Sequence, residues 1–150
     1  MRLGVISDTH GELPEGVLEQ FAGTDAILHA GDIGPIDIVH QLEAVAPVRA
    51  VQGNMDYGQV ADIYPRTDMF ELGGAFFYLM HEPYLLDLDP SAAGISCVVF
   101  GHTHIPTVEE RDGVLFLNPG SAGRPKWGSR PTVAILQIND GVVRAEIVEI

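Results

Sequence analysis

Aspartate, histidine and asparagine recur along this chain in short groups that suit metal binding. The groups are Asp8-Thr9-His10, Gly31-Asp32, Gly53-Asn54, His81 and Gly101-His102-Thr103-His104. Their carboxylate, amide and imidazole ligands suit Mn, Fe or Zn better than Ca or Mg, which prefer oxygen alone. Together they supply the ligands that a hydrolytic site with two cations needs.

Each group has a plain structural explanation when it is taken alone. An isolated Asp-x-His occurs by chance, His81 fits a hydrogen-bonded histidine at a strand end, and Asn54 after a glycine is a common turn residue. His102 and His104 are a stronger signal, because alternate residues of a strand share a face. The order of all five groups, each at the end of an apolar run, favours the metal site.

The elements that must position these groups alternate between strand and helix in the first half of the chain. The predicted buried strands are residues 3–7, 26–30 and 48–51. Helices are expected from Pro14 to about Phe21 and from Pro35 to Val45. This alternation is typical of parallel βαβ units, in which ligands bind outside the carboxyl ends of the strands.

The second half is predicted to fold mainly into hairpins. The turns are Gly73-Gly74, Asp112-Gly113 and Asn139-Asp140-Gly141, between strands at 69–72 and 75–80, 107–111 and 114–117, and 132–138 and 142–147. Residues 98–100 add a buried strand that ends at Gly101. We expect one α/β domain over residues 1–150, with two packed mixed β-sheets flanked by helices.

Composition narrows the possible partners and locations. A net charge of −13 argues against broad nucleic-acid affinity, and no apolar run approaches the ~18 residues of a membrane span. The first residues enter a strand directly, without a signal-peptide pattern, and the single cysteine, Cys97, lies in an apolar run. We expect a cytoplasmic protein with no membrane association and no stable nucleic-acid binding, and a homo-oligomer is compatible with the sequence.

With these residues in place, the chain resembles the calcineurin-like metallophosphoesterase superfamily over essentially its whole length. The series Asp-x-His, Gly-Asp, Gly-Asn, His and Gly-His-x-His is highly specific for that superfamily. The loop Asn118-Pro119-Gly120-Ser121 is a mark of its small bacterial and archaeal phosphodiesterase branch. The fold of this branch is shared by a eukaryotic retromer subunit.

The resemblance implies a ligand set and a reaction. One ion would be held by Asp8, His10, Asp32 and His104, and the other by Asp32, Asn54, His81 and His102. The ions are expected to be Mn, with Ni, Fe or Zn as alternatives, because cellular supply often decides. The implied reaction is attack of metal-activated hydroxide on a small or nucleotide-like phosphodiester, in preference to a monoester. Asp32 and Asn54 would be catalytic, and Asn54 would also touch the phosphate.

Two positions depart from the family pattern. Met55 stands where many members have a histidine that protonates the leaving group, so we expect substrates with good leaving groups to be favoured. Glu82 follows His81 where glycine is frequent, and it either repels phosphate or supports a ligand. The intact ligand set disfavours the alternative function, a protein-interaction scaffold that keeps the fold and the metal site but has little catalysis.

Several polar residues near the motifs are candidates for supporting roles. Arg124 and Lys126, in a loop rich in glycine and proline, are predicted to bind the substrate phosphate, the arginine by a bidentate fork; the alternative is an ordinary charged surface loop. Asp56 is expected to brace its own loop. His29 is either a packed neighbour or a residue that orients a ligand. Asn118 and Ser121 would orient a histidine ligand, line the cleft or simply form a turn.

Overall fold

The computed structural model describes residues 1–150, which form ten strands and three short α-helices. The strands are β1 (Arg2–Ile6), β2 (Ala26–His29), β3 (Val48–Ala50), β4 (Thr67–Leu72), β5 (Ala75–Met80), β6 (Cys97–Val99), β7 (Thr107–Arg111), β8 (Val114–Asn118), β9 (Thr132–Asn139) and β10 (Val142–Glu149). The helices are α1 (Glu15–Gln20), α2 (Asp37–Glu43) and α3 (Gln59–Ile63), and Pro83–Leu85 form a turn of 3-10 helix.

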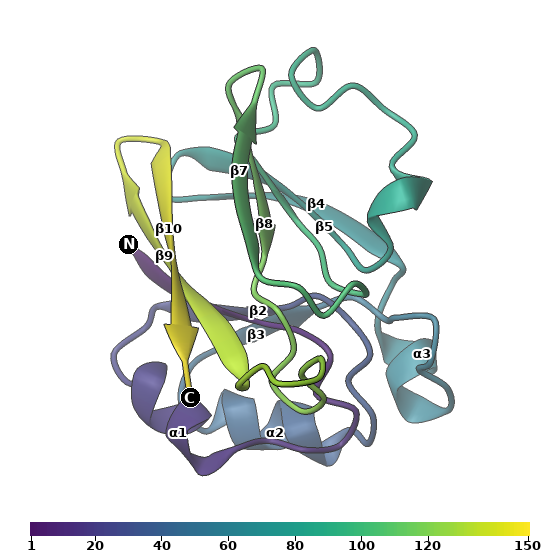
Figure 1. Ribbon diagram of the computed structural model, residues 1–150. Coiled ribbons are helices and arrows are strands. Elements are labelled where there is room, and N and C mark those ends of the chain that lie inside the picture. Colours follow the sequence, from purple (N-terminus) through teal and green to yellow (C-terminus); the bar gives the residue numbers. More distant parts are fainter.

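The strands form two five-stranded mixed sheets, as predicted (Figure 1). The first sheet has the order β10-β9-β1-β2-β3, and its three strands β1, β2 and β3 are parallel. The second has the order β4-β5-β6-β8-β7, with β5, β6 and β8 parallel and an antiparallel strand at each edge. Each sheet therefore sends the carboxyl ends of its three parallel strands to a single edge.

Two layers of apolar side chains hold the sheets and helices together. One layer lies between the sheets and includes Leu3, Leu28, Phe77 and Leu136. The other lies between the first sheet and the helices, which cover its opposite face (Figure 1). Cys97 is buried in the layer between the sheets, where burial raises the pKa of its thiol.

The structure adds two elements that the periodicity did not predict, α3 and the 3-10 turn. Only Val60 of α3 is buried, so this helix presents no apolar stripe that a sequence pattern reveals. The three predicted hairpins are present, and Asp112 and Asp140 adopt the left-handed conformation in their turns. None of the helices has the length and the apolar character that a membrane span requires.

Candidate metal centre

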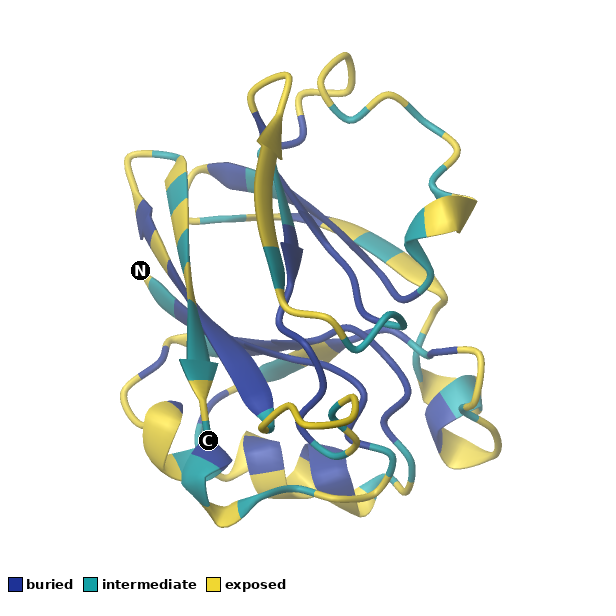
Figure 2. Cartoon of the chain, in the orientation of Figure 1, coloured by how far each residue is buried: buried dark blue, intermediate teal, exposed yellow.

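The predicted ligand residues all lie in loops that follow the parallel strands of the two sheets. These loops come after β1, β2 and β3 in the first sheet and after β5 and β6 in the second, and they carry Asp8, His10, Asp32, Asn54, His81, His102 and His104. The loops after β1 and β2 start with buried residues, whereas the loop after β3 is exposed at Asn54 and the hairpin turns are mostly exposed (Figure 2). The fold thus gathers residues from positions 8 to 104 into one place.

The backbone of the centre is unusual. Five of the seven residues, Asp8, His10, Asp32, His102 and His104, have φ between 47° and 68°. This left-handed region is uncommon for residues with a side chain, although aspartate and histidine enter it more readily than most. Such strained conformations concentrate at functional sites, where the surrounding structure holds them in place.

Glycines let the neighbouring loops approach the carboxylates closely. A Cβ atom on Gly53 would lie 2.1 Å from Asp32 Oδ1, and one on Gly101 would lie 2.0 Å from Ser7 Oγ. Gly53 and Gly101 therefore make room for the neighbouring loops, and at the second of these turns the positive φ lies on His102.

The carboxylate of Asp8 faces three histidines through one oxygen. Asp8 Oδ1 lies 3.1 Å from His104 Nε2, 3.8 Å from His10 Nε2 and 3.9 Å from His81 Nε2. Burial raises the pKa of Asp8, although the nearby histidines oppose the shift. Burial also disfavours the charged form of His10, so it lowers the pKa of this ring.

The other oxygen of Asp8 is fixed by hydrogen bonds from the protein. Oδ2 accepts from the Ser7 hydroxyl at 2.6 Å and from the backbone N–H of His102 at 3.1 Å. These bonds orient the carboxylate so that Oδ1 points at the histidines. Sequence reasoning missed Ser7, because a serine at the end of a buried strand carries no pattern of its own.

Asp32 links the histidines of the two sheets. Its Oδ2 lies 3.2 Å from His81 Nε2 and 3.6 Å from His10 Nε2, and its Oδ1 accepts the backbone N–H of Met55 at 2.9 Å. Burial favours a higher pKa for Asp32, but the adjacent His81 outweighs it and holds the pKa below its usual value. Burial alone would lower the pKa of His81, but the carboxylates of Asp32 and Asp8 raise this pKa above its usual value. Charges that favour a proton at His81 favour a divalent cation in the same place.

Backbone carbonyls fix the orientation of two of the histidine rings. His81 Nδ1 donates to the Ala30 carbonyl at 2.7 Å, and His104 Nδ1 donates to the Arg124 carbonyl at 2.7 Å. A carbonyl only accepts hydrogen bonds, so each Nδ1 carries the hydrogen and each neutral ring turns the lone pair of Nε2 toward the carboxylates. This tautomer is the one that a histidine ligand needs when it binds a metal through Nε2.

The unpaired atoms of the centre fit a bound cation. Asp8 Oδ1, His10 Nε2 and His81 Nε2 are buried and make no hydrogen bond, although nearly all buried polar atoms in proteins have a partner. These atoms belong to two overlapping groups of possible metal ligands, Asp8-His10-His104 and Asp8-Asp32-His81. Within each group the ligand atoms all lie within 4.8 Å of one another. A divalent cation in each group would supply the missing partner.

Asn54 and His102 form a separate pair beside these groups. Asn54 Oδ1 lies 3.0 Å from His102 Nδ1, and the His102 ring packs edge-on against His81, with 5.3 Å between ring centroids. The structure thus brings five predicted ligands into close donor groups and places the other two next to them, on the more exposed side. The Glu82 carboxylate accepts a hydrogen bond from the Tyr84 hydroxyl.

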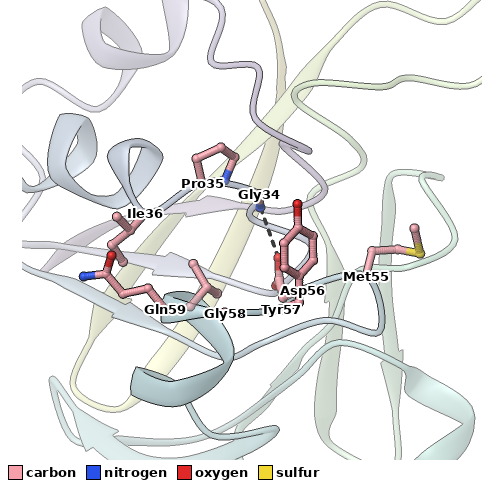
Figure 3. Close-up of a pocket in the computed structure, with 9 residues that line it drawn as sticks. Gly34, Pro35, Ile36, Met55, Asp56, Tyr57, Gly58 and Gln59 are labelled. Carbon is pink, nitrogen blue, oxygen red and sulfur yellow. Dashed lines mark hydrogen bonds between the residues drawn. The ribbon is translucent and has the colours of Figure 1, made fainter.

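Asp56 braces the loops of the centre, as expected. Its carboxylate accepts backbone N–H bonds from Ile33 at 2.9 Å, from Gly34 at 3.0 Å and from Gly53 at 2.8 Å. Figure 3 shows the bond to Gly34 at the wall of a hollow that Met55 and neighbouring residues also line. With its oxygens engaged by backbone groups, Asp56 supports two ligand-bearing loops.

Buried polar residues also tie the remaining loops together. Asn118 Nδ2 donates to the Gly101 carbonyl and to Thr103 Oγ1, both at 2.9 Å, so it shapes the loop that carries both histidines of the His-x-His motif. Ser121 Oγ donates to the Asp8 carbonyl at 2.9 Å. Asn118 therefore supports the loop of the two histidines, and Ser121 supports the loop that carries Asp8.

His29 supports the centre without facing it. The Gly31 N–H donates to His29 Nδ1 at 3.2 Å, so Nε2 carries the hydrogen and donates to Thr9 Oγ1 at 3.0 Å. Thr9 then donates to the Ile33 carbonyl at 2.7 Å. This buried chain joins the loop after β1 to the loop after β2, which are the two loops that carry the aspartates.

Comparison with known proteins gives a consistent picture. The sequence profile of the calcineurin-like phosphoesterase superfamily domain matches residues 1–141. A probable metallophosphoesterase of Methanothermobacter thermautotrophicus is 38% identical over 99% of this chain and 92% of its own. The structure of a novel archaeal phosphodiesterase superposes with a TM-score of 0.82 at 25% identity, over 99% of this chain and 100% of the other. Vps29 of Entamoeba histolytica in complex with Zn²⁺ has a TM-score of 0.78 at 24% identity over 99% of each chain, which shows a shared fold.

Proposed function

Because this chain belongs to the calcineurin-like phosphoesterase superfamily, we propose that it hydrolyses small phosphodiesters at a centre of two divalent cations. The observation that carries the proposal is the convergence of three unpaired buried atoms, Asp8 Oδ1, His10 Nε2 and His81 Nε2. Burying such atoms without a partner costs roughly 1–3 kcal/mol each. A cation bound by these atoms would offset that cost.

The residues divide between two positions. One cation would be held by Asp8, His10, Asp32 and His104, and the other by Asp32, Asn54, His81 and His102. When bound, the cations lower the pKa of water and stabilise charge on the phosphoryl oxygens. Mn²⁺ is the expected metal, with Ni²⁺, Fe²⁺ and Zn²⁺ as alternatives; the Zn²⁺ complex of the Vps29 neighbour supports the last of these.

The remaining chemistry falls to side chains at the open side of the centre. The Asn54 amide would donate a hydrogen bond to a phosphoryl oxygen, and Arg124 and Lys126 would supply positive charge for the bound phosphate. Met55 carries no titratable group, so nothing at this position protonates the departing oxygen. Good leaving groups are therefore favoured, and the phosphodiesterase neighbour supports a diester in preference to a monoester.

A protein-interaction function is the second candidate. Exposed apolar side chains, including Met55, Tyr57, Tyr84 and Leu85, come from the loops around the centre. Such side chains suit a protein partner.

Hydrolysis by metal-stripped protein decides between the two candidates. We would supply Mn²⁺, Ni²⁺ or Zn²⁺ to the stripped protein, measure release of nitrophenol from bis-p-nitrophenyl phosphate and count bound metal by mass spectrometry. The control variant is Asp32→Asn, which keeps the shape of the side chain but removes the charge shared by both cations. Turnover that needs metal and is lost in Asp32→Asn supports the enzyme, whereas two bound ions without turnover favour the interaction function.

A further inference from the structure

A large aromatic side chain stands fully in solvent beside the centre. Trp127 has 101% of its reference surface exposed, and it is the only tryptophan in the chain. It lines one hollow together with His104, Arg124, Pro125 and Lys126. The hollow therefore joins an indole ring, two basic side chains and a histidine of the metal centre.

The loop that carries Trp127 is fixed at its base to the metal-binding residues. Ser121 Oγ donates to the Asp8 carbonyl at 2.9 Å and accepts the Arg124 N–H at 2.8 Å. The Arg124 carbonyl in turn accepts the hydrogen of His104 Nδ1 at 2.7 Å. Trp127 thus lies three positions along the chain from a backbone group that is bonded to a predicted ligand.

The tip of the loop is a turn that presents its side chains outward. The Ser129 N–H donates to the Lys126 carbonyl at 2.9 Å, with Trp127 between the two. A rigid base and a short turned tip place the indole at the edge of the centre and leave its ring faces uncovered.

The charge of this loop differs from that of the rest of the molecule. The net charge of the chain is −13, yet three of its eight basic residues are Arg124, Lys126 and Arg130. The arginine ion pairs of the protein join Arg49 to Asp68, Arg111 to Glu109 and Arg130 to Glu149. Arg124 and Lys126 therefore keep free positive charge beside the indole, where a phosphate oxygen is attracted.

We propose that Trp127 is a specificity residue that stacks on a flat aromatic ester group of the substrate. The preferred diesters then carry a nucleobase or a similar ring on one side of the phosphate. The inference rests on the proposed function, because the phosphate must sit at the metal centre for its ester group to reach the loop. Stacking on an indole accepts any base, since every base has a π face.

Binding to the Zn²⁺-loaded protein tests the platform without catalysis. The fluorescence of the single tryptophan should be quenched by adenosine monophosphate. Ribose 5-phosphate, which has the phosphate but no aromatic ring, should not quench it. By calorimetry, Trp127→Ala should raise the Kd of adenosine monophosphate about tenfold, which is the contribution expected from one stacked base. The Kd of ribose 5-phosphate should stay unchanged. Trp127→Phe should retain most of the affinity. Tyr57→Ala is the matched control, because Tyr57 is an exposed aromatic residue that lines a different hollow.

Kinetics with two substrates that share a leaving group test the same residue in turnover. We expect Trp127→Ala to raise the KM of thymidine 5′-p-nitrophenyl phosphate about tenfold, with little effect on methyl p-nitrophenyl phosphate. Hydrolysis of both diesters with equal effects of the variant would refute the platform and leave the phosphodiesterase intact. Absence of hydrolysis with any metal, together with ring-dependent binding at Trp127, would refute the enzyme and leave the platform. A change of oligomeric mass in Trp127→Ala without a loss of adenosine monophosphate binding would assign the indole to a contact between copies and overturn the proposal.

Discussion

A single buried histidine should make this protein lose stability as the pH falls from 7 to 5. Burial lowers the pKa of His29 from 6.5 to about 3, and its Nδ1 accepts the Gly31 N–H, so the folded protein keeps the ring neutral. The unfolded chain takes up a proton on this ring near pH 6.5. Stability falls with decreasing pH wherever the unfolded state binds more protons, so His29 destabilises the fold across the window from about 6.5 to about 3.

The size of the effect follows from the distance to the unfolded pKa. At pH 5 the value of 6.5 lies about 1.5 units above the pH, and each unit corresponds to about 1.36 kcal/mol. His29 alone should therefore remove about 2 kcal/mol of unfolding free energy between neutral pH and pH 5. The loss keeps growing down to about pH 3, where the folded protein also takes up the proton.

Urea unfolding at pH 7 and pH 5, with metal removed by a chelator, measures this loss. His29→Asn keeps an acceptor near the Gly31 N–H but has no group that titrates. We expect the variant to be less stable than the wild type at pH 7. On going to pH 5 it should lose about 2 kcal/mol less unfolding free energy than the wild type. His40→Asn is the control, because the His40 ring is 60% exposed on α2; it should keep the wild-type loss. Equal losses in the wild type and His29→Asn would refute the reasoning.

Three further substitutions test the centre. Gly53→Ala should abolish metal binding and hydrolysis, because its Cβ would lie 2.1 Å from Asp32 Oδ1. Gly16→Ala is the control and should keep the wild-type metal content, because its Cβ meets only the side chain of Ile150, the last residue of the chain. Full metal content in Gly53→Ala would contradict the steric argument. Met55→His should raise kcat for diesters with poor leaving groups by up to ~10²-fold, because the ring would act as a general acid. The kcat for diesters with good leaving groups should change little. An equal rise in kcat for both kinds of diester would exclude proton donation. Arg124→Ala keeps the backbone carbonyl, so it should raise KM for a charged diester more than it lowers kcat, and an unchanged KM would reject phosphate binding by this side chain.

The strand pattern was sufficient to predict the two mixed sheets and the edge at which the motifs gather. Short apolar runs that end in polar residues mark buried parallel strands, and the paired turn residues located all three hairpins. The position of Asp32 or His102 in the fold therefore followed from local sequence. Their roles as metal ligands stay predictions that the metal counts above would test.

The finer geometry had no local signal in the sequence. The N–H of His102 that orients the Asp8 carboxylate lies 94 residues away from it, and the Ser121 hydroxyl that holds the Asp8 carbonyl lies 113 residues away. No periodicity reports such contacts, because they form only when the sheets have docked. The left-handed backbone at Asp8 and His104 is likewise imposed by tertiary contacts, since most side chains disfavour it.

The division of the predicted ligands between the sheets has a consequence for the lifetime of the protein. Asp8 follows a strand of the first sheet and His104 a strand of the second, so a cation held by both acts as a cross-link across most of the chain. The docked state alone presents both residues, and a ligand at a hundredfold excess over its Kd adds about 2.7 kcal/mol to the stability of the state that binds it. Proteases cleave the transiently opened chain. The rate at which a cell degrades this protein would then fall when metal is plentiful and rise when metal is scarce.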